Sequence, residues 1–189
     1  SEFAQLEDMP AIVIEEPPRP VLPRRSREPT SMQDEIQLAA SICSESKRAV
    51  VSMFNEARMG KAVDAANAQS LVAESSDSVR RNPGALISLA RLKTADDYTY
   101  MHSVAVCAMM VALAKQIGLS EEHTLSAGMA GLLHDLGKAA IPLPVLNKPG
   151  KLTDSEFAVV KSHPVKGYNM LKEGGNVEHS ALDACLHHH

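Results

Sequence analysis

Residues 127–138 read Ala127-Gly128-Met129-Ala130-Gly131-Leu132-Leu133-His134-Asp135-Leu136-Gly137-Lys138, and this stretch decides the fold. Small residues precede His134 by one and two helical turns, so a neighbouring helix can approach this one closely. We expect Gly137 to end the helix in a left-handed conformation. His134 and Asp135 offer a nitrogen and a carboxylate to the same small volume, and both groups bind divalent transition metals. For this pair alone we favour a structural role, with Asp135 bonded to nearby backbone and Lys138 at a helix C-terminus.

Helical patterns continue on both sides of this stretch. The chain is 44% hydrophobic but has no Trp, three Phe and three Tyr, so its core must consist of Leu, Val, Ala and Met. These residues favour helices over sheets, and no segment alternates with period two for long enough to form a strand. We therefore predict an all-α fold. The first helix is expected from a cap at Thr30 or Ser31 to about Met59. The next three are expected at about Lys61–Arg80, Pro83–Leu92 and Asp96–Ile117.

Three parts of the chain differ in composition. Residues 1–30 hold six of the eleven prolines among charged residues, which is typical of an extended linker or, alternatively, a partner-binding tail. Residues 31–95 form a predicted helical extension for packing or dimerisation. Residues 96–189 contain the candidate catalytic and metal-binding side chains.

Charge and cysteine content limit the class of protein. A net charge of −4 without a basic block argues against a nucleic-acid polymer as partner, and an anionic substrate would need positive charge supplied locally, for example by metal ions. Cys43, Cys107 and Cys185 lie far apart and fit buried free thiols in a reducing compartment.

The longest apolar stretch, residues 104–114, is shorter than the ~20 residues of a membrane span. With no signal peptide recognised, we expect a cytoplasmic protein.

Two further histidines come from other predicted helices. His102 shares a helical face with five other residues, so we expect it to point inward; these are Tyr98, Ala105, Val106, Met109 and Leu113. A lone inward histidine is more often a hydrogen-bonded core residue than a ligand. His163 precedes Pro164, which places it at a break between two helices and suits either a metal ligand or an N-terminal cap.

The last predicted helix runs from about Val177 to the end of the sequence. Its apolar face, continued at 100° per residue, includes His188 and, at its edge, His189, while His187 falls on the polar side. The terminal histidines are therefore either native ligands or the remainder of a purification tag.

The loop after the His-Asp pair contains Lys148 and Lys151 on either side of a Pro-Gly turn. These lysines can face an anionic substrate, although exposed lysines usually have no specific role. Thr153 and Glu156 predict a capping box for the helix that follows.

Taken together, four separate segments supply six side chains that can surround two metal ions about 3.5–4 Å apart. These side chains are His102, His134, Asp135, His163, His188 and His189.

The order of these motifs resembles the HD-GYP family of HD-domain phosphohydrolases over roughly residues 96–189. The matching text is Tyr98-Thr99, His102-Ser103, His134-Asp135-Leu136-Gly137-Lys138, Ile141-Pro142, Lys148-Pro149-Gly150-Lys151-Leu152-Thr153, His163 with Gly167, and the terminal histidines. The resemblance implies an HD-domain helical bundle with an N-terminal helical extension, two or three bound Fe or Mn ions, and hydrolysis of cyclic di-GMP in bacterial signalling. By matching position, the same six side chains are the metal ligands and Lys138 contacts phosphate.

Two features depart from the family pattern. The family's Asp-Gly-x-Gly-Tyr-Pro segment is expected a few residues after His189, where the sequence ends, so we expect an incomplete site and little or no activity from these 189 residues. Tyr98 stands where three-metal members carry a glutamate, which favours a two-metal centre.

The resulting hypothesis is metal-assisted hydrolysis of cyclic di-GMP to a linear dinucleotide or GMP. Asp135 would bridge the ions, and Lys138 would stabilise charge on the phosphoryl oxygens. One alternative is an HD-type hydrolase of another nucleotide or a phosphomonoester. Another is a non-catalytic module that binds a signalling nucleotide or a protein partner, with a homodimer also possible.

Overall fold

The computed structural model describes residues 28–63, 65–92 and 98–189. Over these ranges it contains helices and no strand, which confirms the predicted all-α fold. The elements are α1 (Met32–Arg58), α2 (Ala66–Arg81), α3 (Pro83–Ala90), α4 (Tyr98–Gln116), α5 (Glu121–Leu133), a 3-10 helix η1 (Leu136–Ala140), α6 (Leu143–Leu146), α7 (Asp154–Val160), α8 (His163–Gly174) and α9 (His179–His187). The prediction for residues 1–27 lies outside the described residues. No helix in the described ranges is both long and apolar enough to cross a membrane.

Local signals set where several of these helices begin. The Ser31 side chain accepts a hydrogen bond from the backbone of Asp34 and caps α1. The predicted capping box of Thr153 and Glu156 is present at α7, and Lys148 lowers the pKa of Glu156 to about 2.

The second helix was predicted to start too early. It begins at Ala66 rather than at Lys61, because Gly60 turns the chain with a φ of 71°. Val63 is then buried in a non-helical segment against Gly174 of α8.

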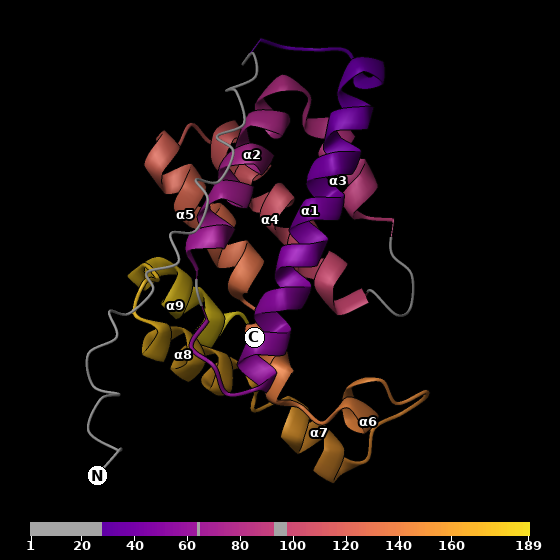
Figure 1. The fold of residues 1–189 in the computed structure, drawn as a ribbon, viewed down its shortest axis with the longest axis vertical. Helices are drawn as coiled ribbons and strands as arrows, with labels where there is room; N and C mark the ends of the chain where they lie inside the picture. Colours follow the sequence, from indigo (N-terminus) through magenta and orange to yellow (C-terminus); the bar gives the residue numbers. More distant parts are fainter. Residues whose placement is uncertain (1–27, 64, 93–97) are drawn as a thin grey trace, which may run out of the picture.

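A single hydrophobic core joins the N-terminal helices to the rest of the chain. In Figure 1 the long helix α1 runs along the bundle, α4 and α5 form a hairpin beside it, and α8 and α9 lie at one end. Helix α1 contacts α2, α3, α4 and η1, while α9 packs between α5 and α8. The largest fully buried apolar side chains come from both halves of the chain: Phe54, Leu86, Leu133, Leu136, Ile141 and Leu171.

Helix α4 turns a different face to the core from the one predicted. It buries Met101, Val104, Ala105, Cys107, Ala108, Val111 and Ala114. Met109 and Leu113, which were expected to point inward with His102, are 43% and 54% exposed. The prediction was wrong because α4 is apolar around most of its circumference, so periodicity alone cannot select one face. The His102 side chain, 32% exposed, lies at the edge of the buried face.

The end of α5 also differs from the prediction. Helix α5 ends at Leu133 with His134 as its C-cap, and the chain continues into η1. Gly137 lies within η1 and is not among the glycines with positive φ, so it does not end the helix in a left-handed conformation.

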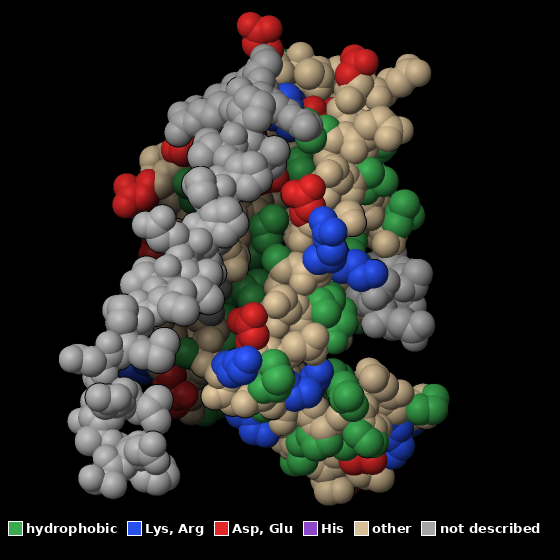
Figure 2. Space-filling view, in the orientation of Figure 1, with side chains coloured by type: hydrophobic (Ala, Val, Ile, Leu, Met, Phe, Trp, Pro, Cys, Tyr) green, Lys and Arg blue, Asp and Glu red, His purple; other side chains and the backbone are tan. Residues whose placement is uncertain are grey.

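Helices α6 and α7 form a lobe (residues 143–160) that projects from one end of the bundle (Figure 1). Apolar side chains gather on its surface in Figure 2, and Leu143, Phe157 and Val159 are exposed there. The ammonium group of Lys161 lies 5.0 Å from the centre of the Phe157 ring.

Candidate metal centre

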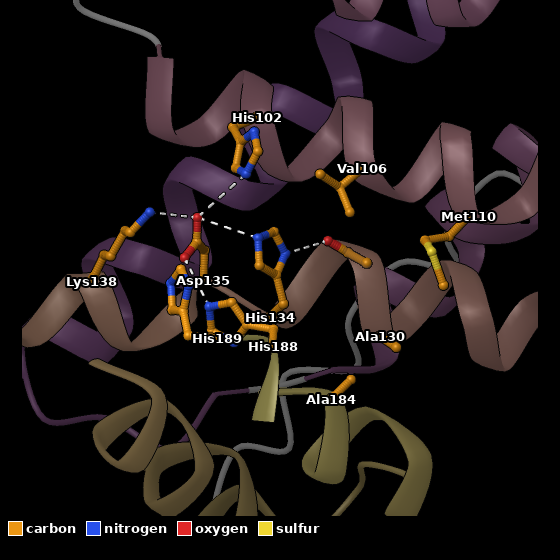
Figure 3. A pocket seen from close by; sticks show the side chains of 11 residues that line it. His102, Val106, Met110, Ala130, His134, Asp135, Lys138, Ala184, His188 and His189 are labelled. Carbon is orange, nitrogen blue, oxygen red and sulfur yellow. Dashed lines mark hydrogen bonds and ion pairs between the residues drawn. The ribbon is translucent and has the colours of Figure 1, made fainter. Parts of the chain in front are cut away.

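Histidine side chains from separate helices meet around one carboxylate. Figure 3 shows His102 reaching from α4, His134 and Asp135 from the end of α5, and His188 with His189 from the end of α9. They line a cavity of about 390 Å³ together with Val106, Met110, Ala130, Gly131, Lys138 and Ala184. The candidate metal ligands from these helices therefore line one cavity beside α4 and α5.

One oxygen of Asp135, Oδ2, faces three nitrogen atoms. The Nζ atom of Lys138 lies 2.6 Å away, Nε2 of His134 3.3 Å away and Nε2 of His102 3.7 Å away. Ligand atoms of His102, His134 and Asp135 all lie within 4.8 Å of one another, which is close enough to share one metal ion.

The other oxygen, Oδ1, faces histidines from α8 and α9. The Nε2 atoms of His163 and His188 lie 3.3 Å and 3.6 Å from it, and 3.0 Å from each other. His163 is buried at the break between α7 and α8, as predicted. His163, His188 and His189 form a second group whose ligand atoms lie within 4.8 Å of one another.

Three of these imidazoles are oriented in the same way by their own helical turn. In each, Nδ1 contacts the backbone carbonyl oxygen three residues earlier. The contacts join His134 to Gly131 at 2.8 Å, His163 to Val160 at 2.7 Å and His188 to Cys185 at 3.0 Å. A carbonyl oxygen only accepts hydrogen bonds, so each Nδ1 carries the proton. In the neutral ring Nε2 then has a free lone pair, the arrangement found in histidines that bind metals.

This arrangement fits a pair of divalent cations. The lone pairs of His163 and His188 face each other and the carboxylate, and acceptors so placed repel unless a positive charge lies between them. Oδ1 of Asp135 is also buried and accepts no hydrogen bond from the described part of the chain. A buried polar atom without a partner is costly, and a metal ion would satisfy it.

The charge states of the centre follow from burial and neighbours. Burial alone would raise the pKa of the Asp135 carboxyl, but the positive charge of the Lys138 ammonium, which contacts Oδ2, lowers it, and that pKa lies well below its usual range. Burial lowers the pKa of His188, which favours the neutral ring. Both residues are therefore in the protonation state in which carboxylates and imidazoles bind metals.

The other predicted residues lie in different surroundings. His187 points outward, as predicted, and its Nδ1 lies 3.1 Å from Oδ1 of Asp183. Lys148 is paired with Glu156 at 2.6 Å, and Lys151 is exposed; neither lines the cavity. Their role in substrate binding stays a prediction.

The apolar wall of the cavity was predicted only in part, because Val106 was placed on the helical face of His102 but Met110 was missed. Val106 and Met110 follow His102 at intervals of four residues on α4, so helical spacing contained the signal. Tyr98 was placed on the helical face of His102 and at the motif position that carries a glutamate in three-metal members. Its ring is stacked on that of His102, with centroids 6.0 Å apart and planes at 4°.

The helices that carry these histidines and Asp135 match a known family. Residues 99–189 match the family model of the HD domain. Residues 99–189 form an HD domain. This match confirms the resemblance recognised in the motifs, and the HD domain is a divalent-metal-binding domain. Residues 4–68, which include α1, match a second model described as a domain of unknown function (DUF3391).

Several curated proteins are similar to this HD-domain chain. It is 58% identical over 159 residues to the cyclic di-GMP phosphodiesterase PA4108 of Pseudomonas aeruginosa, covering 84% of the chain and 38% of that protein. It is 50% identical over 78 residues to the cyclic di-GMP phosphodiesterase response regulator RpfG of Xanthomonas campestris, covering 40% and 21%. It is 34% identical over 95 residues to the 3'3'-cGAMP-specific phosphodiesterase 1 of Vibrio cholerae, covering 46% and 22%. The chain thus spans well under half the length of these relatives. No solved structure matches it significantly.

Proposed function

We propose that this protein is a metal-dependent phosphodiesterase that hydrolyses cyclic di-GMP. The observation that carries the proposal is the orientation of His134, His163 and His188, whose Nδ1 atoms contact backbone carbonyls while their Nε2 atoms face Asp135. The similarity to two proteins named cyclic di-GMP phosphodiesterases supports the substrate.

In this proposal two divalent ions, Fe or Mn, occupy the centre. A donor set of imidazoles and a carboxylate suits these metals. His102, His134 and Asp135 would hold one ion, and His163, His188 and His189 would hold the other. Asp135 would serve both, because its Oδ1 atom faces His163 and His188. When bound, such ions polarise a phosphoryl oxygen and make water more acidic.

Lys138 adds a fixed positive charge at the cavity. Its ammonium group contacts Oδ2 of Asp135, and its side chain is 22% exposed. We propose that this charge binds a non-bridging phosphate oxygen and stabilises the charge that develops there during hydrolysis. Val106 and Met110 add apolar surface to the wall of the same cavity.

The organisation of the chain is part of the same proposal. We assign residues 96–189 to the HD-GYP domain, residues 31–95 to a helical extension, and residues 1–30 to a linker or tail. Because α1 packs on η1 and α4, the extension would support the metal centre directly. A cytoplasmic signalling role, with a homodimer or a protein partner, stays a prediction.

A second candidate substrate is 3'3'-cGAMP. The similarity to the Vibrio cholerae enzyme named for that nucleotide favours it. Cyclic di-GMP and 3'3'-cGAMP share the phosphodiester ring and differ in one base. The metal ligands and Lys138 are placed to act on phosphate, so they would serve both nucleotides.

The test is turnover of both nucleotides by the full natural protein after anaerobic loading with Mn or Fe. We expect hydrolysis that EDTA abolishes and Mn restores. Asp135→Asn should reduce turnover by more than the roughly 10- to 100-fold lost when residues beside metal ligands are changed. His187→Ala, which changes an outward histidine two residues from the ligand His189, should retain turnover. Full activity in the Asp135→Asn variant would refute the proposal.

A further inference from the structure

The backbones of η1 and α8 touch at two glycines. A Cβ atom added to Gly137 would overlap the carbonyl oxygen of His163 and lie 2.6 Å from the backbone nitrogen of Gly167. A Cβ atom added to Gly167 would lie 2.9 Å from the backbone nitrogen of Gly137 and 2.7 Å from Sγ of Cys185. Ordinary van der Waals contacts of a Cβ begin at 3.4 Å, so neither position has room for a side chain.

Space, rather than backbone conformation, explains these glycines. Neither Gly137 nor Gly167 has a positive φ, so an L-residue could adopt both backbones. Gly167 lies inside α8, where glycine is about 1 kcal/mol less favourable than alanine. Because both glycines lack a side chain, η1 and α8 can approach each other closely, and the packing gained by this approach offsets the cost.

The contact joins two segments that carry ligands of the proposed centre. Gly137 follows Asp135 by two residues, and Gly167 follows His163 by one helical turn. The side chains of Asp135 and His163 meet at the centre, where Nε2 of His163 lies 3.3 Å from Oδ1 of Asp135. Metal–ligand distances tolerate shifts of about 0.2 Å. A methyl group that separates the segments by several tenths of an ångström would therefore take His163 out of bonding range.

We propose that Gly137 and Gly167 are a positioning pair that holds His163 at the metal centre. This inference rests on the two-ion centre proposed above. Only one ion should depend on the pair, because the two ligand groups are supported differently. His102, His134 and Asp135 come from the α4–α5 hairpin, which packs along its own length. The ion bound by His163, His188 and His189 instead depends on how α8 sits against η1.

The test is Gly167→Ala, measured as Mn²⁺ ions bound per chain by elemental analysis and titration calorimetry. The full natural protein should bind two ions, and its Gly167→Ala variant should bind one with normal affinity and the other roughly 10- to 100-fold more weakly. The control is Gly128→Ala, in which the added Cβ would meet Val72 at 2.5 Å and Val111 at 2.8 Å, away from α8. Thermal unfolding should show that both variants are destabilised, yet Gly128→Ala should still bind two ions.

A second comparison covers the possibility that Gly167→Ala does not fold. Cys185→Ala removes the sulfur atom that crowds position 167 but keeps the contact with Gly137. We expect Cys185→Ala to bind two ions and Gly167→Ala in that background to bind one. Two ions with unchanged affinities in both Gly167→Ala proteins would overturn the positioning role while leaving the proposed function intact. Absence of bound Mn²⁺ in the wild-type protein would overturn both.

Discussion

Replacing Glu35 with alanine should lower the stability of the whole protein, because it leaves a buried guanidinium group without its carboxylate. Glu35 in α1 and Arg81 at the end of α2 are 2% and 6% exposed. Their side chains form a two-pronged pair, with Nε to Oε2 at 2.7 Å and Nη2 to Oε1 at 2.8 Å. Ser78 and Thr30 donate two further hydrogen bonds to the same carboxylate, at 2.8 Å and 3.1 Å.

The size of the effect follows from this burial. Removing one partner of a buried, hydrogen-bonded ion pair costs about 3–5 kcal/mol, a large share of the roughly 5–15 kcal/mol that stabilises a typical domain. Replacing both partners with apolar residues is often close to neutral. Glu35→Ala and Arg81→Met should therefore each lose several kcal/mol. The double variant Glu35→Leu/Arg81→Met should lose much less than the sum of the two.

The assay is urea unfolding at pH 7, followed by circular dichroism. Glu45→Ala is a matched control on the same helix, because the carboxylate of Glu45 accepts an exposed hydrogen bond from Ser41. It should change the free energy of unfolding by less than about 0.5 kcal/mol. A loss below about 1 kcal/mol for Glu35→Ala would refute the reasoning.

The same pair predicts a pH dependence. Burial raises the pKa of Glu35, but hydrogen bonds from Arg81 and Ser78 and the charge of Arg81 outweigh it, so the pKa falls below its ordinary value of 4.5. The stabilisation is therefore fully present above pH 4.5 and is lost as the pH falls through the folded-state pKa. Between pH 7 and pH 3 the urea midpoint of the wild-type protein should fall further than that of Glu35→Gln. Parallel pH profiles would contradict this.

Three further outcomes are expected. His188→Ala should reduce bound Mn²⁺ from two ions to one per chain by elemental analysis, while equal loss in the neighbouring His187→Ala would show that the histidines act only as a tag. Phe54→Ala should lower the free energy of unfolding in urea by about 3–5 kcal/mol, because Phe54 is 1% exposed; a loss below about 1 kcal/mol would mean that α1 does not share the core. Burial raises the pKa of Cys107 and Cys185 to about 12, so iodoacetamide at pH 8 should label them slowly in the folded protein and quickly in urea, and rapid labelling without urea would contradict this.

Features that depend on a few neighbouring residues could be predicted from the sequence. Ser31 begins α1 and the capping box begins α7 because a cap needs only a side chain and the backbone three residues later. The outward position of His187 and the inward position of His188 likewise followed from the angle per residue within one helix.

Features that depend on distant partners could not be predicted in the same way. The ion pair of Glu35 and Arg81 left no sign in the local sequence pattern, since the two residues lie 46 positions apart. The inward face of α4 was misjudged because the helix is apolar on most sides and its neighbours decide which side is covered. Gly137 was assigned to a helix end, because sequence gave no sign that α8 passes against it.

The candidate metal centre combines both kinds of information. The orientation of His134, His163 and His188 is set within single helical turns, where Nδ1 donates to the carbonyl three residues earlier. That local arrangement prepares each Nε2 atom to bind a metal, but it does not bring the rings together. Their meeting depends on contacts between segments, including the one between Gly137 and Gly167. A change at a ligand should therefore remove one bond to an ion, whereas a change at a glycine contact should separate ligands that are each still correctly oriented.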